Sequence, residues 1–443
     1  MQEVGLARLL SGVGAMLKRF VNVKDEEAGP VLVSFFYFFT LMCGYAILKP
    51  LRDEMATAKG VQGVPWLFTA TFLVMLVAVP VFSALVSRWP RRRVLPLVYR
   101  FFLLHLLIFF GVLKLGVDRD AVARAFFVWV SVYNLFVVSV FWTFMADLFV
   151  NEQGRRLFGF IAAGGTTGML VGPFLVKLLA EPVGATNLML ITAVLLEASA
   201  RCVRRLSRQE TLAPSRARSA EDPVGGGVFA GLRLLFSSPL LRGLALQMLL
   251  YAATSTFLYY QQVHIVDRGA SGANARAAAF ANIDFWVQVL TLVLQLGVTG
   301  RLIHRFGLGA ALAVAPLLTA LGFAGLALLP TLGMLISFKA LRNASHYALE
   351  RPGREILFTG VDRETKYKSK GFIDTVVYRG SDTVSSWLYR GLDVLGLGPM
   401  GLALSAVPVA CLWLTVSVWL ARYSRAHLPA SEPAWSASTN AAR

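Results

Sequence analysis

Twelve long apolar stretches are the feature of this sequence that most limits its fold. Each is long enough, as a helix, to cross the roughly 30 Å hydrocarbon layer of a bilayer. Of the 443 residues, 56% are apolar and only 15% are charged, which excludes a soluble enzyme, a disordered chain and an extracellular disulfide scaffold. We predict an all-α membrane protein with twelve transmembrane helices, at 31–50, 66–87, 94–113, 125–149, 157–180, 185–203, 240–264, 277–298, 308–328, 331–350, 370–394 and 401–421.

Basic residues are distributed unevenly between the two sides of the predicted membrane. If the N-terminus is cytoplasmic, the cytoplasmic segments hold 27 Lys and Arg residues and the outer segments hold seven. Because Lys and Arg are retained on the cytoplasmic side, we expect a multi-pass protein of the cell inner (plasma) membrane with both termini in the cytoplasm. The net charge of +18 arises mainly from the basic residues of the cytoplasmic segments. The expected partner is therefore the lipid bilayer and not a nucleic acid.

The longest central hydrophilic segment, 204–226, divides the predicted spans into two sets of six. A weak internal repeat supports this division, because the short basic segment 83–94 corresponds to 297–307 in the second set. We therefore expect two pseudo-symmetric six-helix bundles. The expected parts are a cytoplasmic surface helix and lead-in (1–28), an N-terminal bundle (29–203), a cytoplasmic linker (204–239), a C-terminal bundle (240–421) and a cytoplasmic tail (422–443).

The two repeated turns resemble the Gly-x-x-x-Asp-Arg-x-Gly turn of the major facilitator transporters, although neither keeps its acidic residue. Twelve spans with a central cytoplasmic loop are also similar to that superfamily. The resemblance implies two bundles related by a pseudo-twofold axis, with substrate bound between them near mid-membrane. Architecture alone does not name the substrate.

A first cluster of charges lies at the end of the first predicted span. Lys49 precedes Pro50, and Arg52, Asp53 and Glu54 follow. Proline removes a backbone hydrogen bond, and we expect it to break the helix here. Two cations beside such a break suit an anionic ligand. The alternative is that the span ends at this point and the charges extend into water.

A second cluster lies at the cytoplasmic end of the fourth predicted span. Asp147 is followed by Arg155 and Arg156, and it is either a substrate contact or a structural partner of these arginines. The glycine-rich run 161–173 comes next. It lacks the Gly-Lys-Ser/Thr of a phosphate-binding loop, so we expect its glycines to allow close helix packing. They are Gly164, Gly165, Gly168 and Gly172.

The third cluster is the densest and covers the tenth and eleventh predicted spans. Ionisable side chains at membrane depth are costly, and each is a functional candidate. Arg379 and Asp382 are three residues apart and can pair on one helix face. We expect this region to line a cavity or a gate, with part of the charges forming gate pairs. Its members are Lys339, Arg342, His346, Glu350, Arg351, Arg354, Glu355, Asp374, Arg379, Asp382, Arg390 and Asp393.

Three weaker features complete the inventory. Asp284 in the eighth span is either a coupling-ion or proton site or a buried structural carboxylate. The segment 259–262, Tyr-Tyr-Gln-Gln, is interpreted as part of an interfacial aromatic belt. Cys43, Cys202 and Cys411 show no metal-ligand spacing and are interpreted as packing residues. Because no catalytic triad, zinc spacing or nucleotide-hydrolysis motif is present, we expect no enzyme, no metal and no cofactor.

Three segments together resemble the nucleotide transporter family, the ATP/ADP translocases that exchange nucleoside tri- and diphosphates. Segment 45–55 is similar to that family's Tyr-x-x-Leu-Arg-Asp-x-Lys-Asp motif, and 141–159 to its Phe-Trp-x-Phe-x-Asn-Glu run. Segment 354–374 resembles a Lys-Glu, Asp, Lys, Lys, Lys, Asp pattern. The resemblance places Arg52 on a required Lys, Asp53 on an Asp, and Asp147 on a required Glu. The residues matched in the third segment are Arg354, Glu355, Asp362, Lys366, Lys368, Lys370 and Asp374.

The sequence departs from this family at informative positions. Arg52 and Asp147 keep the sign of the family's charge but change its reach. Asp382 is an acid where the family has a base, which argues against polyphosphate binding by the eleventh span. The resemblance nevertheless implies exchange of adenine nucleotides without ATP hydrolysis.

These observations predict a secondary transporter for anionic small molecules, with ATP and ADP as the candidates that the resemblance implies, acting as a monomer by alternating access. Its predicted substrate-binding residues are Lys49, Arg52, Asp53, Asp147, Arg354, Glu355, Asp374 and Arg379, and its coupling or gating residues are Asp284, Asp382, Arg155 and Arg156. The alternatives are a proton-coupled permease or efflux pump for another solute, and a non-transporting membrane scaffold. Charged spans argue against the scaffold, which needs no ionisable groups at membrane depth.

Overall fold

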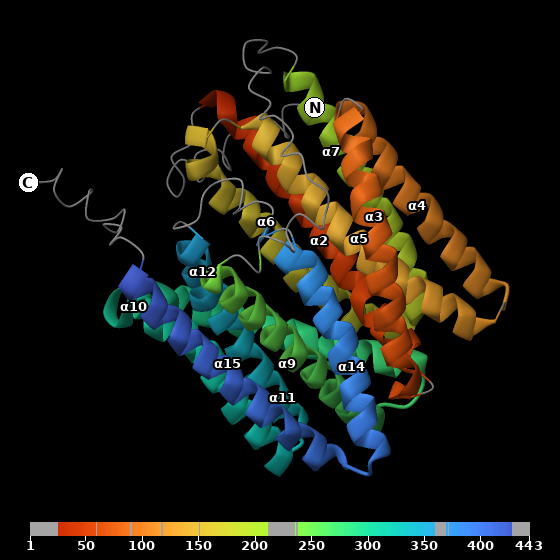
Figure 1. The fold of residues 1–443 in the computed structure, drawn as a ribbon. Coiled ribbons are helices and arrows are strands. Elements are labelled where there is room, and N and C mark those ends of the chain that lie inside the picture. The colour runs from red at the N-terminus through yellow and green to blue at the C-terminus, as the bar shows by residue number, and fades with distance from the viewer. Residues whose placement is uncertain are drawn as a thin grey trace, which may run out of the picture. The chain divides into compact units, whose positions relative to one another are not determined.

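A computed structural model describes residues 25–58, 60–88, 91–116, 118–149, 151–210, 235, 238–358, 369–370 and 372–427. Within these ranges the chain is helical and contains no strand, which confirms the expected all-α class (Figure 1). The α-helices are α2 (Asp25–Thr57), α3 (Val64–Arg88), α4 (Arg91–Lys114), α5 (Arg119–Leu148), α6 (Asn151–Leu179), α7 (Leu188–Glu210), α9 (Pro239–Gly269), α10 (Ala273–Leu328), α11 (Leu332–Ser345), α12 (Arg351–Phe358), α14 (Tyr378–Val394) and α15 (Pro399–His427). The surface helix expected within 1–28 falls almost wholly outside the described residues.

Seven helical stretches of the described chain are long and apolar enough to cross a membrane. One of them, Leu157–Ser207, includes two of the predicted spans. The protein is therefore a multi-pass membrane protein, and the full number of twelve spans remains a prediction. The stretches are Glu27–Thr57, Val61–Val81, Leu95–Lys114, Arg119–Trp142, Leu157–Ser207, Leu308–Leu328 and Pro399–Ala426.

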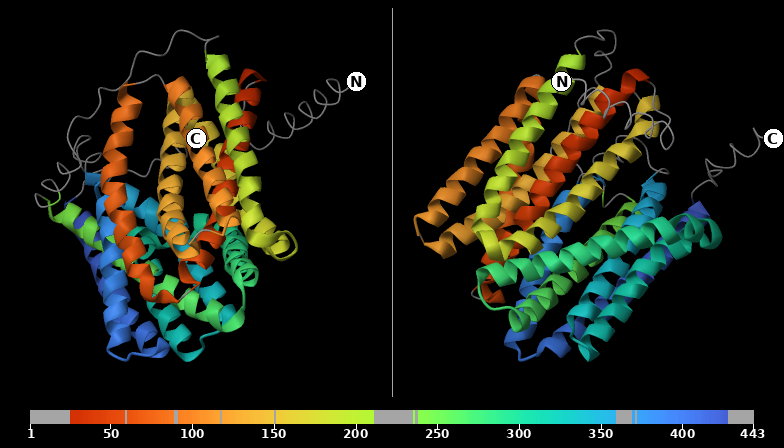
Figure 2. Two further views of the ribbon diagram at one scale, coloured as in Figure 1. Left: turned by 90° about the vertical axis from the view of Figure 1, so that its right-hand side faces the viewer. Right: turned by 180° about the vertical axis from the view of Figure 1, so that it is seen from behind.

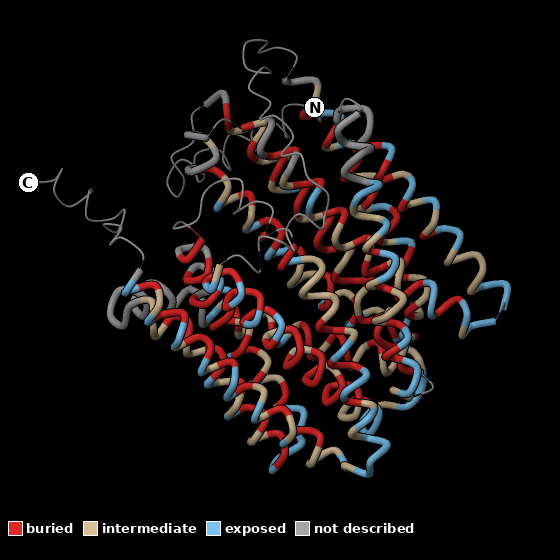
Figure 3. Tube along the Cα trace, viewed as in Figure 1, coloured by how far each residue is buried: buried red, intermediate tan, exposed pale blue. Residues whose placement is uncertain are grey.

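Large apolar side chains cover the outer faces of several helices. Val77 on α3, Leu97 on α4 and Val194 on α7 are all more than half exposed, while Ser199, Gln247 and other polar residues are buried. Figure 3 shows this alternation of exposed and buried positions along the helices. Water would penalise such a surface and lipid accepts it, so the burial pattern agrees with a membrane environment.

The chain divides into two compact units. The first contains Met1–Gly63, Leu73–Pro223 and Ala270–Phe285, and the second contains Val64–Phe72, Val224–Gly269 and Trp286–Arg443. The first unit therefore includes the start of α10, most of which belongs to the second unit. The second unit includes the start of α3, most of which belongs to the first. The predicted domain boundaries at 203 and 240 remain a prediction.

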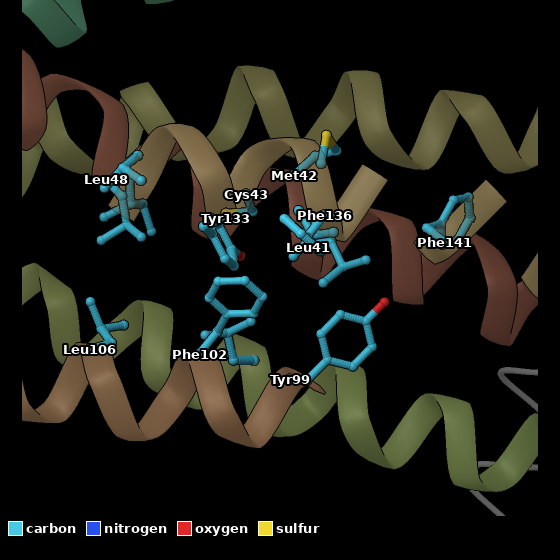
Figure 4. Packing of buried hydrophobic residues seen from close by; sticks show 14 of the residues in the cluster. Leu41, Met42, Cys43, Leu48, Tyr99, Phe102, Leu106, Tyr133, Phe136 and Phe141 are labelled. Carbon is cyan, nitrogen blue, oxygen red and sulfur yellow. The ribbon is translucent and has the colours of Figure 1, made fainter. Parts of the chain in front are cut away.

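Helix α2 is the central element of the first unit and packs against α5, α6 and α7 (Figures 1 and 2). Its contact with α6 depends on the glycine-rich run. A Cβ atom on Gly164 would lie 2.3 Å from the Phe35 carbonyl oxygen, and one on Gly168 would lie 2.5 Å from that of Phe39. These distances leave no room for a side chain, so the predicted packing role of the glycines is confirmed. Aromatic and aliphatic residues of α2, α4 and α5 complete the core of this unit (Figure 4).

The second unit is arranged around α9, which packs against α14 and α15. Leu241 and Leu244 of α9 meet Trp413 and Leu420 of α15 in its apolar core, and all four are fully buried. Two π-helical turns, His346–Glu350 and Ile373–Val377, precede α12 and α14. Such turns concentrate at functional sites, and both of these lie in the densest charge cluster of the sequence.

The expected helix break at Pro50 is wrong. Helix α2 continues through Pro50 to Thr57, so neither the break nor the end of the span occurs at that point. Proline fixes a backbone angle that a helix accepts, and it removes a single hydrogen bond. Neighbouring helices can compensate that loss within a membrane protein. The charged turn 52–54 is consequently helical and packed rather than unwound.

The turn expected at 297–307 is also wrong, because α10 is one helix from Ala273 to Leu328 and covers the eighth and ninth predicted spans together. No proline interrupts this basic segment, so helical hydrogen bonding can continue through it. The aromatic-belt interpretation of 259–262 fails as well. Tyr260, Gln261 and Gln262 are buried at 1–3% exposure, and a position in an interfacial belt requires a polar end in contact with water.

Candidate functional site

In the first unit, the C-terminal turns of α2 hold a cation that is neutralised by its neighbour in the sequence. Arg52 donates from Nε and Nη2 to Oδ1 of Asp53, at 2.9 and 2.7 Å. Its guanidinium lies 4.7 Å above the ring of Phe127, and Nη1 reaches the Ser131 hydroxyl at 3.4 Å. Asp53 is 1% exposed. The predicted pair of binding residues thus forms one compact ion pair against α5.

Lys49 lies one turn earlier and pairs with a residue distant in sequence. Its ammonium group donates to Oδ2 of Asp284, about three turns into α10. The two side chains keep 24% and 11% of their surface exposed. The structure therefore brings together a predicted binding residue and a predicted coupling residue, which can hold each other's charge in a partly buried position.

Glu54 is a buried acid that the sequence analysis did not select. Its carboxylate accepts from Arg119 Nη2 at 3.4 and 3.5 Å, and its side chain is 5% exposed while that of Arg119 is 57% exposed. A cavity of about 390 Å³ lies beside it, lined by Leu51, Glu54, Met55, Leu113, Gly116, Asp118, Arg119, Ala185, Thr186, Met189, Ala273 and Asn274. The sequence shows Glu54 as an acid directly after Asp53, but its partner Arg119 is 65 residues away and is not apparent from the local sequence.

In the second unit, Arg354 of α12 is deeply buried with few partners. Its side chain is 7% exposed, and Nη2 lies 3.4 Å from Oδ1 of Asp374 in the second π-helical turn. Nη1 donates to the sulfur of Met248 at 3.3 Å, and Nε has no hydrogen-bond partner among the described residues. Asp374 keeps 36% of its side chain exposed. Two predicted binding residues thus meet through a long contact that leaves guanidinium donors unused.

Arg342 is a second buried arginine of this unit, and its Nε likewise has no hydrogen-bond partner among the described residues, but its Nη2 has oxygen partners at shorter distances. Its Nη2 donates to the Tyr251 carbonyl, the Thr254 hydroxyl and the Ser255 hydroxyl, at 3.0, 3.1 and 2.7 Å. The guanidinium also lies 4.6 Å from the centre of the Tyr251 ring. This arginine joins α11 to α9 and is held as a structural group.

His346 and Glu350 form a buried pair next to Arg342. Nδ1 of His346 lies 2.8 Å from Oε2 of Glu350, and the imidazole stacks on Tyr251 with ring centres 4.1 Å apart. Both residues occur in the charged run of the sequence but were not selected, because stacking on a distant tyrosine leaves no sequence signal.

The predicted pair on the eleventh span is confirmed. Arg379 Nη1 lies 3.3 Å from Oδ2 of Asp382, three residues along α14. The Thr256 hydroxyl of α9 donates to Oδ1 of the same carboxylate at 3.1 Å. Asp382 is 5% exposed, so its charge is satisfied inside the second unit.

Four selected residues lie outside the residues whose side chains the structure describes: Asp147, Arg155, Arg156 and Glu355. The others fall into two groups, one in each unit. Lys49, Arg52, Asp53 and Asp284 lie in the first, and Arg354, Asp374, Arg379 and Asp382 lie in the second. Within the described part of the chain, no group of three or more His, Cys, Asp or Glu side chains is placed to hold a metal ion.

Comparison with known proteins agrees with these observations. A family model described as "Major Facilitator Superfamily" matches residues 31–341. The chain is 23% identical to ADP,ATP carrier protein 1 of Chlamydia trachomatis serovar D, over 89% of this chain and 87% of that protein. It is also 23% identical to ADP,ATP carrier protein 1 of Chlamydia muridarum, over 94% and 92%. The predicted resemblance to nucleotide carriers is thereby confirmed as a distant one.

Solved structures show the same fold. The nucleoside transporter NupG superposes with a TM-score of 0.60 at 14% identity, covering 90% of this chain and all of that one. A POT family transporter gives a TM-score of 0.63 at 10% identity, covering 90% and 97%. The human organic anion transporter MFSD10 gives 0.60 at 16% identity, covering 89% and 100%. At these identities the likeness concerns the fold alone.

Proposed function

The chain belongs to the Major Facilitator Superfamily, and we propose that within it this protein exchanges adenine nucleotides, or anions of the same phosphate chemistry, across the membrane by alternating access. Family membership makes it a secondary transporter and not an enzyme. Two features support the finer proposal. One is the likeness to the chlamydial ADP,ATP carrier proteins along nearly the whole chain, and the other is the state of Arg354.

The observation that carries the proposal is that the buried guanidinium of Arg354 has few and weak partners. A guanidinium has five N–H donors, and here it contacts one carboxylate at 3.4 Å and one thioether at 3.3 Å. Phosphate oxygens accept two parallel N–H bonds from arginine and carry more charge than the sulfur they would replace. Asp374 is partly exposed and can move aside. Arg354 can therefore release its present partners in favour of a phosphate group.

Two other arginines, the half-buried Arg52 and the buried Arg342, are less suited to this role. Arg52 makes two bonds shorter than 3.0 Å to Asp53, and Arg342 satisfies three oxygen atoms of α9. Displacing those partners would leave the buried Asp53 carboxylate without its guanidinium, or the buried Arg342 without its three oxygen acceptors, and either loss is costly. We propose that Arg52 and Arg342 position helices and that Arg354 contacts the anion.

Exchange without net transport follows from the same chemistry. A cation that loses its partner must not remain uncompensated while buried. If Asp374 leaves Arg354 when the carrier reorients, then only a bound anion keeps the charge paired. The loaded carrier would then reorient readily and the empty carrier poorly.

The test is exchange of labelled ADP against ATP in proteoliposomes containing the purified protein. We expect Arg354→Ala to lower kcat/KM for exchange by about 10- to 100-fold, the loss associated with one charge-assisted hydrogen-bonding group. Arg354→Lys keeps the charge but loses the two-point contact, so its loss is expected to be smaller. Arg242→Ala, at an exposed position of α9, serves as the matched control. Folded protein that exchanges no nucleotide would remove the nucleotide proposal.

A proton-coupled permease is the second candidate, and Asp382 is the observation that favours it. This carboxylate is 5% exposed on α14 and accepts from both Thr256 and Arg379. A buried acid with movable partners can carry a proton through a transport cycle. Uphill uptake driven by a pH gradient without internal substrate, and lost in Asp382→Asn, would favour this candidate over exchange.

A further inference from the structure

The cavity beside Glu54 has no part in the proposed exchange function. Its lining comes from the end of α2, the connection between α4 and α5, the turn that precedes α7 together with the first residues of α7, and the start of α10. All of these lie within the first unit. These are the turns that the distribution of basic residues predicts to face outward. A volume of about 390 Å³ is within the range of small-molecule sites, from roughly 300 to 1,000 Å³.

The walls of the cavity combine an apolar surface with one buried charge. Leu51, Met55, Leu113 and Met189 form its apolar part. Glu54 is the buried charge, and its side chain is only 5% exposed. An isolated buried carboxylate is strongly unfavourable, and two arginines, Arg119 and Arg276, act on Glu54.

Of these two cations, Arg119 is the one in contact with Glu54, and it is loosely held. Arg119 approaches Glu54 at 3.4 to 3.5 Å, whereas charge-assisted N–H···O bonds are usually about 2.7–2.9 Å. More than half of the Arg119 side chain is exposed, so it can swing into solvent at little cost. A ligand ammonium inside the cavity can make a shorter bond to Glu54 than Arg119 does.

Two other polar groups of the lining are already used within the protein. Asp118 accepts from the backbone N–H of Asp120 at 3.0 Å and caps the start of α5. Asn274 accepts from the Ala185 N–H at 3.0 Å. Among the lining residues, Glu54 and Asp118 are acidic and Arg119 is basic, and Arg276 adds a second positive charge that acts on Glu54. Because Asp118 already serves as a helix cap, Glu54 is the lining carboxylate that remains for a ligand cation.

We infer that this cavity is a binding site for a small amphipathic amine, in which the ammonium group pairs with Glu54 and displaces Arg119 while an apolar group lies against Leu51, Met55, Leu113 and Met189. The site is separate from the anion chemistry of Arg354. Its ligand carries a charge opposite to that of the proposed transport substrate.

Three probes with one framework test the inference: 2-phenylethylammonium, the neutral 2-phenylethanol and the anionic 3-phenylpropionate. Binding to the full-length protein in lipid nanodiscs is measured by isothermal titration calorimetry at neutral pH. We expect the ammonium probe to bind and the other two to bind at least about tenfold more weakly, because only the first can pair with the carboxylate. Equal binding of all three, or no binding of the ammonium probe, would overturn the inference.

Two variants separate ligand contact from a merely structural role. Glu54→Gln should weaken ammonium binding by about tenfold or more. Arg119→Gln should strengthen it, because the competing internal cation is removed, and a purely structural role of this pair predicts no gain in affinity. Glu181→Gln, at an exposed position of the same unit, is the matched control and should bind as wild type. Unchanged affinity in Glu54→Gln, or weaker binding in Arg119→Gln, would contradict the assignment.

Discussion

The contact between α2 and α6 allows the sharpest stability prediction, for the substitution Gly168→Ala. The added Cβ would lie 2.5 Å from the Phe39 carbonyl oxygen and 2.7 Å from the Cys43 nitrogen. Ordinary contacts begin at 3.4 Å, and both obstacles are backbone atoms that cannot rotate away. The two helices must therefore separate locally by about 0.9 Å.

The free-energy cost follows from this separation. Radial gaps of about 0.5–1 Å forfeit roughly a quarter to a half of the dispersion energy of the atoms involved. Overpacking of a well-packed core costs about 1–3 kcal/mol, and alanine returns up to about 1 kcal/mol through its higher helix propensity. Because the new Cβ clashes with two backbone groups at once, we expect an overpacking cost in the upper part of the range of about 1–3 kcal/mol. After the gain in helix propensity, the free energy of unfolding should fall by about 2 kcal/mol.

Equilibrium unfolding in mixed micelles measures this difference, with Gly159→Ala as the control. Gly159 lies on the same helix, and a Cβ there would meet nothing within 4 Å. The control should be neutral or slightly stabilising, since alanine favours the helix. If Gly168→Ala unfolds within about 0.5 kcal/mol of wild type, as ordinary surface substitutions do, then the close approach of the two helices is refuted.

Two further predictions concern cationic side chains and their partners. Lys49→Met and Asp284→Asn should each destabilise the protein by about 1–3 kcal/mol, because each leaves a partly buried charge without this partner. The double variant should lose less stability than the sum of the two single losses. Additive losses in unfolding experiments would argue against the pair. Arg342→Lys should cost about 2–3 kcal/mol, because an ammonium group cannot reach three oxygen atoms of α9 and cover the Tyr251 ring at once. Arg242→Lys, at an exposed site of the same unit, should change stability by less than about 0.5 kcal/mol, and equal losses in the two variants would contradict the structural role of Arg342.

Local features of the sequence predicted the fold well. The apolar runs identify the membrane helices because an apolar stretch of that length has few other stable environments. The glycines of 161–173 were assigned correctly to helix packing, since the alternative phosphate-binding loop lacks its remaining residues. The Arg379–Asp382 pair is also local, because a spacing of three residues places both side chains on one helix face.

Long-range partners explain what sequence reasoning could not find. Pro50 suggested a break in the first span, with an end of the span as the alternative, but α2 continues through it, and Phe127 and Ser131 of α5 help to cover Arg52 in the turn that follows. Asp284 acquires its role from Lys49, which is 235 residues away. The stacking of His346 on Tyr251 and the two π-helical turns of the second unit have no signature at the level of residue spacing.

The partners of α2 also limit how the first unit can move. The middle of this helix touches the backbone of α6 through glycines, and its end is tied to α5 through Arg52 and Glu54 and to α10 through Lys49. Sliding α2 alone would break these ion pairs in a partly buried setting and open the glycine contact together, and packed elements of this kind shift between discrete arrangements rather than deform continuously. We therefore expect α2, α5 and α6 to move as one body during transport, so that Gly168→Ala should slow substrate exchange even at temperatures where the variant is fully folded. A folded Gly168→Ala carrier with the exchange rate of wild type would show that α2 moves independently of α6.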